Sequence, residues 1–141
     1  MLRKRIRPDL RVNQDGAAVV EFAFALPILI MFIWGIAQLG MIFTADAGIQ
    51  HALGEGARMA TLWPTPTNTA VKQRMQNSLF GTFLGSYTVE DPVSSSTSTA
   101  GNRYTDLKIT YTVTPDYLFF RGSAISFVRS KRVYTTEPVT S

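Results

Sequence analysis

One uninterrupted apolar run constrains this 141-residue chain more than any other feature. Residues 22–43 read FAFALPILIMFIWGIAQLGMIF, which is 22 residues without a charge and with Gln38 as the one strongly polar side chain. At about 1.5 Å per residue a helix of this length measures about 33 Å, enough to cross the roughly 30 Å hydrocarbon core of a bilayer. A soluble core helix would carry a polar stripe, and this run carries none. The run predicts a membrane-spanning helix, with Trp34 near its middle and therefore not at an interface.

The charges on either side of the run predict its orientation. Residues 1–16 hold five basic and two acidic residues, whereas the other 125 residues hold nine basic and eight acidic ones. The positive-inside rule therefore places the N-terminus in the cytoplasm and the C-terminal part outside. A basic leader this short is not the spread basic surface that nucleic acid requires, so we expect no nucleic-acid partner.

A secretory signal peptide is an alternative interpretation of the same run. Residues 45–47 read Ala-Asp-Ala, a nominal cleavage signal, after which a secreted domain would begin at Gly48. Signal peptides, however, have apolar regions of about 7–15 residues. The longer run favours a single-pass membrane protein.

Glu21 is an acid at the start of the apolar run. A lone carboxylate costs about 2–3 kcal/mol at the centre of a membrane helix and less near the interface. One interpretation is an interfacial side chain that reaches towards water. The other depends on Gly16: a cut before Ala17 would remove the leader and create an α-ammonium group with a pKa of about 8. In an assembly of parallel helices, that ammonium could pair with Glu21 of a neighbour and fix the axial register.

The residues around Gly16 resemble a known processing site. Gly16 is followed by AAVVEF, with glutamate at the fifth position after the cut and an aromatic residue next, as in type IV pilin-like proteins. The longer segment 14–62 resembles the TadE-like family of tight-adherence (Tad/Flp) pilus assembly proteins. Further shared features are Pro27, two glycines near the far end of the run, and the Glu-Gly-Ala-Arg sequence at 55–58. The chain departs from the family at Gly54, where arginine is common, and at Gln38, where an acid is common.

This resemblance implies a function and a set of partners. A prepilin peptidase would cut the chain, with Gly16, Ala17, Glu21 and Phe22 as the processing residues. The mature protein would be a minor pilin-like subunit, or pseudopilin, of the bacterial inner membrane that acts in pilus assembly and cell adhesion. Its partners would be other pilin-like subunits, the peptidase and the inner-membrane pilus assembly platform. The alternative is an uncleaved, membrane-anchored binding or sensor module.

Small residues recur every four positions after the apolar run. They are Gly48, Ala52, Gly56 and Ala60. Such spacing places them on one face of a helix that continues to about residue 62 and allows another backbone to approach closely. The face packs either on a partner helix or on the C-terminal domain of the same chain, and the sequence leaves both open.

The rest of the chain predicts a small α+β domain. Prolines at 64 and 66 end the first helix, and a second helix is expected from Thr67 or Asn68 to about residue 84. Strands are expected at 86–93, 104–114 and 124–136, with a polar loop at 94–102. The predicted organisation is a leader (1–16), a long helix (17–62, membrane span 22–43) and an extracytoplasmic domain (63–141). A roughly three-stranded antiparallel sheet on one or two helices fits the type IV pilin-like architecture that the resemblance implies.

The sequence offers little for catalysis. The chain has no cysteine and one histidine, His51. No phosphate-binding glycine loop, nucleophile elbow or close carboxylate pair occurs. We therefore expect no enzyme activity, no metal and no cofactor. The basic residues of the C-terminal part are expected to form a solvated strand face; they are Arg121, Arg129, Lys131 and Arg132.

Overall fold

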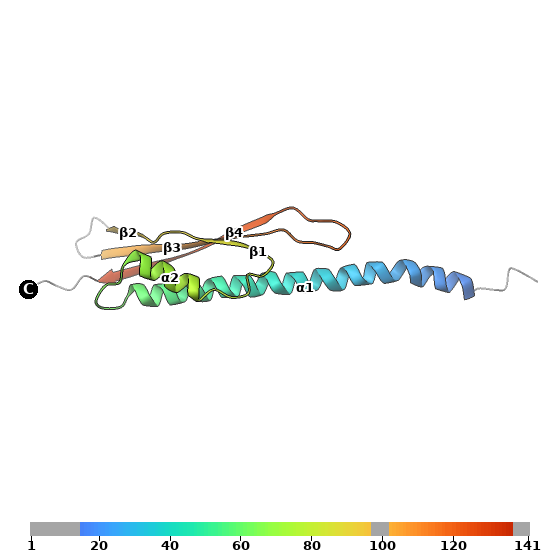
Figure 1. The fold of residues 1–141 in the computed structure, drawn as a ribbon, viewed down its shortest axis with the longest axis horizontal. Coiled ribbons are helices and arrows are strands. Elements are labelled where there is room, and N and C mark those ends of the chain that lie inside the picture. Colours follow the sequence, from blue (N-terminus) through green and yellow to red (C-terminus); the bar gives the residue numbers. More distant parts are fainter. Residues whose placement is uncertain (1–14, 97–101, 137–141) are drawn as a thin grey trace, which may run out of the picture.

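Two helices precede four strands in the computed structural model, which describes residues 15–96 and 102–136 (Figure 1). In chain order the elements are α1 (Asp15–Ala60), α2 (Asn68–Asn77), β1 (Gly85–Val89), β2 (Val93–Ser96), β3 (Asn102–Val113) and β4 (Ile125–Thr136). Every strand pairing is antiparallel. The predicted α+β fold, with a long N-terminal helix, a second helix and a small sheet, is confirmed.

Helix α1 is the axis of the molecule. Its 46 residues extend over about 69 Å at the rise of an α-helix. The sheet and α2 lie along its C-terminal half, while its N-terminal part projects alone (Figure 1). The helix ends at Ala60, where the Thr61 hydroxyl bonds the Arg58 carbonyl at 2.8 Å, just before the two prolines.

The sheet is centred on β3. Strand β4 pairs with the whole of β3, and β1 and β2 pair with opposite ends of its other edge. Because β1 and β2 lie end to end along one edge of β3, the sheet is three strands wide, which agrees with the roughly three strands predicted. The loop predicted at 94–102 is wrong at both ends, because Val93–Ser96 forms β2 and β3 begins at Asn102; residues 97–101 lie outside the described part of the chain. Pro92 separates β1 from β2, since proline has no N–H to continue a ladder.

One layer of apolar side chains joins the sheet to the helices. The inward face of β3 alternates with its polar outer face, as the sequence pattern predicts. Its buried residues are Leu107, Ile109, Tyr111 and Val113. They lie in one core cluster with α1 and α2, whose main contributions are Ala45, Ile49, Ala52, Leu53, Val71 and Met75.

Helix α2 is shorter than predicted. Its N-cap is Thr67, whose hydroxyl accepts a hydrogen bond from the Ala70 N–H at 3.2 Å. The helix ends at Asn77 rather than near residue 84. Beyond it, Gly81 has a φ of +72° and lies against the backbone of α1, so the chain leaves the helix and crosses α1 closely. Phe83, which a helix that continued to residue 84 would include, is 84% exposed.

Candidate assembly and membrane surface

The predicted processing site lies at the exposed start of α1. Gly16 is the second residue of the helix, and a side chain added there would meet nothing within 4 Å. Ala17, Glu21 and Phe22 are all exposed. Helix ends fray easily, so this segment is accessible to a peptidase that binds an extended chain.

Glu21 stands alone on an apolar surface. Within residues 15–96 and 102–136, no hydrogen bond or ion pair satisfies its carboxylate. Its surroundings on α1 are bulky apolar side chains, also exposed; they include Val19, Val20, Phe22, Phe24 and Leu26. Residues 19–26 of α1 therefore neither pack against nor form polar contacts with any other described part of the chain.

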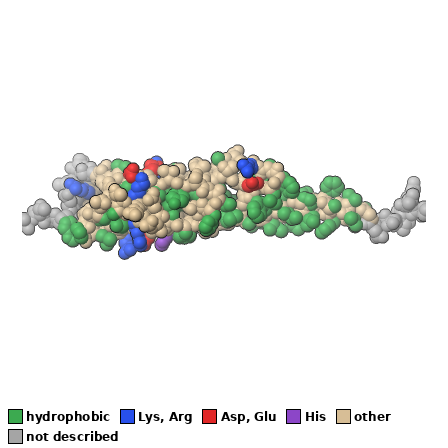
Figure 2. Space-filling view, in the orientation of Figure 1, with side chains coloured by type: hydrophobic (Ala, Val, Ile, Leu, Met, Phe, Trp, Pro, Cys, Tyr) green, Lys and Arg blue, Asp and Glu red, His purple; other side chains and the backbone are tan. Residues whose placement is uncertain are grey.

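The N-terminal part of α1 is long and apolar enough to cross a membrane. The apolar window within Gly16–Ala60 has a mean hydropathy of 2.3, and none of that window is buried by the rest of the protein. Figure 2 shows green apolar side chains along this half of the molecule, while charged side chains gather over the sheet and α2. A helix with this surface requires lipid or other apolar helices around it.

The hairpin between β3 and β4 folds back onto the apolar run. Gln38 is only 3% exposed, and its side-chain amide exchanges two hydrogen bonds with the backbone of Asp116. The Asp116 N–H donates to Gln38 Oε1 at 2.9 Å, and Gln38 Nε2 donates to the Asp116 carbonyl. Trp34 Nε1 donates to the same carbonyl at 2.7 Å. Gln38, the one strongly polar residue of the apolar run, therefore holds the β3–β4 loop at Asp116, which lies 78 residues further along the chain.

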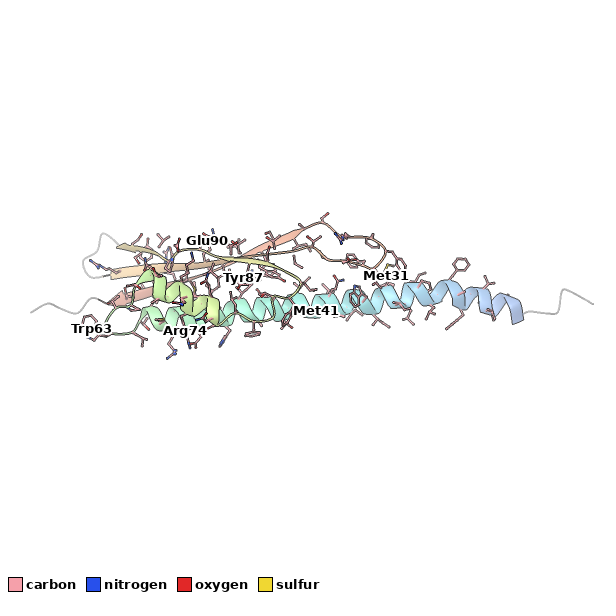
Figure 3. The ribbon with its side chains drawn as sticks, viewed as in Figure 1. Met31, Met41, Trp63, Arg74, Tyr87 and Glu90 are labelled. Atoms are coloured by element: carbon pink, nitrogen blue, oxygen red, sulfur yellow. The ribbon has the colours of Figure 1, made fainter. Side chains whose placement is uncertain are left out.

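The tip of this hairpin is apolar and exposed. Leu118, Phe119 and Phe120 are 50%, 71% and 56% exposed. The Tyr117 and Phe120 rings stack with centroids 5.0 Å apart, and the Tyr117 ring lies over Gly35 of α1. A groove of about 280 Å³ runs between the tip and the helix, and Met31, at its edge, lies below the tip in Figure 3.

The small-residue stripe of α1 packs within the chain. A Cβ at Gly48 would overlap the carbonyl oxygen of Phe80 and lie 2.9 Å from its carbon. A Cβ at Gly56 would lie 2.8 Å from the sulfur of Met75 in α2. Ala52 and Ala60 are buried in the same core. Of the two alternatives that the sequence leaves open, the close approach seen here is that of the chain's own α2 and the segment after it. By contrast, the glycine at position 54 has open space around it.

The predicted basic face is largely neutralised by carboxylates. Arg129 bonds Asp46 of α1 at 2.8 Å, and Arg132 makes two bonds of 2.7 and 2.8 Å to Asp106. The hydrogen bonds from Arg132 hold the pKa of Asp106 below its ordinary value, and the bonded Asp106 raises the pKa of Arg132. One of these ion pairs joins β4 to α1 and the other joins β4 to β3, so neither arginine forms an open anion site.

A second ion pair links the two helices. Glu55 of α1 accepts from Arg74 Nε of α2 at 3.1 Å, and Arg58 approaches the same carboxylate at 3.4 Å. The hydrogen bond from Arg74 is the main cause that lowers the Glu55 pKa. The stick view places Arg74 on the outside of the helix pair (Figure 3). His51 packs against the ring of Phe80, with centroids 5.7 Å apart.

The described residues show no gathering of catalytic groups. No three side chains among His, Asp and Glu approach one another closely enough to hold a metal in that part of the chain. A pocket of about 380 Å³ lies where the end of α1 meets β2 and β3, and its lining has no His, Asp or Glu. Tyr111 is fully buried, its hydroxyl has no hydrogen-bond partner among the described residues, and burial raises its pKa.

The secretory alternative conflicts with the position of its cleavage site. The bond between Ala47 and Gly48 lies inside α1, and the neighbouring residues Ala45 and Ile49 are fully buried in the core. Cleavage there would divide the helix on which the sheet packs.

Comparison with known proteins relates the first part of the chain to a family. No curated protein and no solved structure matches the chain. The family model described as TadE-like protein matches residues 16–58, which is less than half of the chain and includes Gly16, Glu21 and Gln38. Residues 16–58 are therefore TadE-like in sequence, which confirms over that segment the resemblance to tight-adherence pilus assembly proteins.

Proposed function

We propose that this protein is a minor pilin-like subunit, or pseudopilin, that acts in the assembly of a tight-adherence (Tad/Flp-type) pilus. It is inserted in the bacterial inner membrane with the leader, residues 1–16, in the cytoplasm. The domain of residues 63–141 lies outside, and its described residues pack on the second half of α1. The TadE-like match supports the family of function. The observation that carries the proposal is Glu21, an exposed carboxylate on an apolar helix with no partner in the described part of its own chain.

Cleavage after Gly16 would supply the missing partner. The new ammonium at Ala17 lies four residues before Glu21, on the same face of the helix. A neighbour's ammonium therefore reaches the height of Glu21 when two parallel helices are offset by about 6 Å, four residues at 1.5 Å each. In a low-dielectric setting such a pair is strongly favoured over an isolated carboxylate, so it selects one axial offset between subunits.

The proposed partners follow from these two steps. A prepilin peptidase recognises Gly16, Ala17, Glu21 and Phe22 and removes the leader. Other pilin-like subunits cover the apolar surface of α1 when the subunit leaves the lipid, and the inner-membrane assembly platform brings them together. This role is structural and requires no catalytic residue of the chain itself.

The N-terminus of the mature protein tests the proposal. N-terminal sequencing or intact mass in cells that carry the matching peptidase should give a chain that begins at Ala17. A chain that begins at Met1 would support the uncleaved, membrane-anchored binding module instead, and one that begins at Gly48 would support a secreted domain.

Two variants separate processing from assembly. Gly16→Ala should block the cut, because a side chain at this position obstructs a narrow peptidase cleft. Glu21→Gln, examined as the chain that has been cut at Ala17, should not be recovered with other pilin-like subunits after cross-linking, since a neutral amide cannot pair with the ammonium. Adhesion equal to that of the native protein by a processed Glu21→Gln chain would refute the role of Glu21.

A further inference from the structure

We propose that the tip of the β3–β4 hairpin, residues 117–120, inserts into the bilayer interface on the domain side and marks the end of the membrane-crossing part of α1 at Trp34. The crossing segment is then residues 17–34 rather than residues 22–43. The inference rests on the membrane anchorage proposed above and goes beyond it, because it assigns a second lipid contact to the outer domain and sets the height of that domain.

The first observation is the position of the tip along α1. Asp116 is bonded to Gln38 and Trp34, and Tyr117 covers Gly35. The hairpin therefore lies beside the last part of the apolar run and covers one side of it. Lipid cannot surround the helix at that height, although it can surround residues 17–30.

The second observation is the character of the tip. Three successive exposed apolar side chains at 118–120 follow Tyr117, and a charged residue stands on each side, Asp116 and Arg121, which pair at 3.7 Å. An aromatic and apolar tip bordered by charges suits the boundary between hydrocarbon and headgroups. Leu118 has a φ of +69°, where glycine or asparagine is the ordinary residue, so the turn keeps an apolar side chain at a position that does not favour one.

The third observation is the length of helix before the tip. Residues 17–34 extend over about 27 Å, close to the roughly 30 Å hydrocarbon core. If the span instead ended at residue 43, Gln38 would lie about 7.5 Å inside the hydrocarbon, and the Asp116–Arg121 pair beside it would be drawn in as well. The shorter span keeps the charges of Asp116 and Arg121 in the headgroup region, where Arg121, 82% exposed in its side chain, can meet lipid phosphate. It places Glu21 about 6 Å inside the opposite face of the hydrocarbon, where the ammonium of a neighbouring subunit, as proposed above, pairs with its charge.

The occupant of the groove follows from the same geometry. The groove between the tip and α1 is lined by apolar and aromatic side chains and opens towards the exposed apolar surface of the helix; its lining is Met31, Phe32, Gly35, Leu39, Tyr117 and Phe120. Because this surface is continuous with the membrane-crossing part of α1, a lipid acyl chain of the adjacent leaflet is the partner that fits it.

Trp34 completes the interfacial contact. Its indole lies on the apolar helix while its Nε1 donates to the Asp116 carbonyl. An amphipathic ring held in this way is typical of the aromatic belt of membrane proteins. In this proposal Trp34 lies at the interface, whereas a span of residues 22–43 would place it at mid-span.

Depth measurements on the full chain in phosphatidylcholine–phosphatidylglycerol vesicles test the proposal. The chain has no cysteine, so single cysteines can carry a nitroxide whose collisions with oxygen and with a water-soluble nickel complex report depth. Phe24→Cys should be deep, Phe119→Cys should lie at the interface, and Thr88→Cys, on an exposed position of β1, should be aqueous. The oxygen-to-nickel collision ratio should fall at least about tenfold from Phe24→Cys to Thr88→Cys, with Phe119→Cys between them.

Trp34 provides a check without a label. In Trp63→Phe it is the sole tryptophan, and bromines near the headgroups should quench it at least about twofold more than bromines near the chain ends, because it lies about 13 Å from the bilayer centre. With a span of 22–43 it would lie about 2 Å from the centre, and the order would reverse. Trp63, 72% exposed at the far end of α1 (Figure 3), should be unquenched in Trp34→Phe.

The outcomes separate this inference from the proposed function. An aqueous Phe24→Cys would refute membrane anchorage itself. A deep Phe24→Cys with a Phe119→Cys as aqueous as Thr88→Cys would leave anchorage intact and overturn the hairpin contact. A shallow Phe24→Cys with a deep Phe119→Cys and deep Trp34 would overturn the crossing segment of residues 17–34.

Discussion

The attachment of the β3–β4 hairpin to α1 should depend on the amide of Gln38. Gln38→Leu keeps the apolar volume of the side chain but removes both bonds to the Asp116 backbone. Each such bond stabilises by about 0.5–1.5 kcal/mol net, so the substitution should weaken docking of the hairpin by about 1–3 kcal/mol. The hairpin can move away and let water reach these backbone groups, so the loss should be local and should leave the core folded.

Hydrogen exchange measures this loss at one atom. The Asp116 N–H should exchange about 5- to 150-fold faster in Gln38→Leu, which is the factor that corresponds to 1–3 kcal/mol. The Gly122 N–H is the matched control, because its acceptor is the Pro115 carbonyl at 2.8 Å within the same loop. Gln38→Glu should be intermediate, since an ionised carboxylate keeps the acceptor and loses the donor. Unchanged protection of the Asp116 amide in Gln38→Leu would refute the reasoning, and equal loss at both amides would show that the loop itself depends on Gln38.

Three further predictions concern the domain, each measured as the urea midpoint of the full chain in detergent micelles. Gly48→Ala should destabilise the protein by about 1–3 kcal/mol, because its Cβ would meet backbone atoms. Gly54→Ala, at a position with open space on the same helix, should stabilise the protein by up to about 1 kcal/mol. A urea midpoint of Gly48→Ala at or above that of Gly54→Ala would contradict the close packing at Gly48. Tyr111→Phe should leave the free energy of unfolding unchanged or raise it by about 1 kcal/mol. Burial raises the pKa of Tyr111, so the native protein should keep its full stability below a pH of about 10 and lose stability as the pH rises through the pKa of the folded state. An equal alkaline loss of stability in Tyr111→Phe would contradict this reasoning. Arg132 lowers the pKa of Asp106, so the ion pair should stabilise the protein above a pH of about 4 and lose this effect as the pH falls through the pKa of folded Asp106. Asp106→Asn should remove this dependence of stability on acid pH. An unchanged acid profile in Asp106→Asn would argue against the ion pair.

The elements that could be predicted are those whose signal lies within a short window. The alternation around Leu107 and Ile109 marks a strand with one buried face, and the apolar run marks α1. Strand β2 is not predicted, because after Val93 it consists of three serines and shows no apolar alternation. Strand β2 lies at the edge of the sheet and is held by its pairing with β3 rather than by apolar side chains. The hydroxyl groups of Ser94 and Thr105, 3.1 Å apart, form a hydrogen bond between the two strands. The predicted end of α2 near residue 84 is too late, because apolar residues recur every four positions at 71, 75, 79 and 83 although the helix ends at Asn77.

The hairpin contact could not be predicted, because it joins residues far apart in sequence. Gln38 looks in sequence like a polar interruption of a membrane helix, and nothing near it indicates a partner at Asp116. The exposed tip, with Phe119 and Phe120 in a connecting loop, was the available signal: apolar side chains in a loop indicate a contact surface. The processing residues around Glu21 could be proposed from the sequence alone, because their chemistry depends on order along the chain rather than on folding.

The continuity of α1 has a mechanical consequence. A single helix of 46 residues carries both the lipid-facing surface and one side of the domain core, with Pro27 as the residue inside it that breaks the regular bonding. Any tilt or rotation of the N-terminal half of α1 is transmitted to the sheet, because the helix continues without a break between them. A force on the domain acts in the same way on the N-terminal half of α1. In the role proposed above, the assembly platform could therefore push on the domain and lift the whole subunit from the lipid in a single movement.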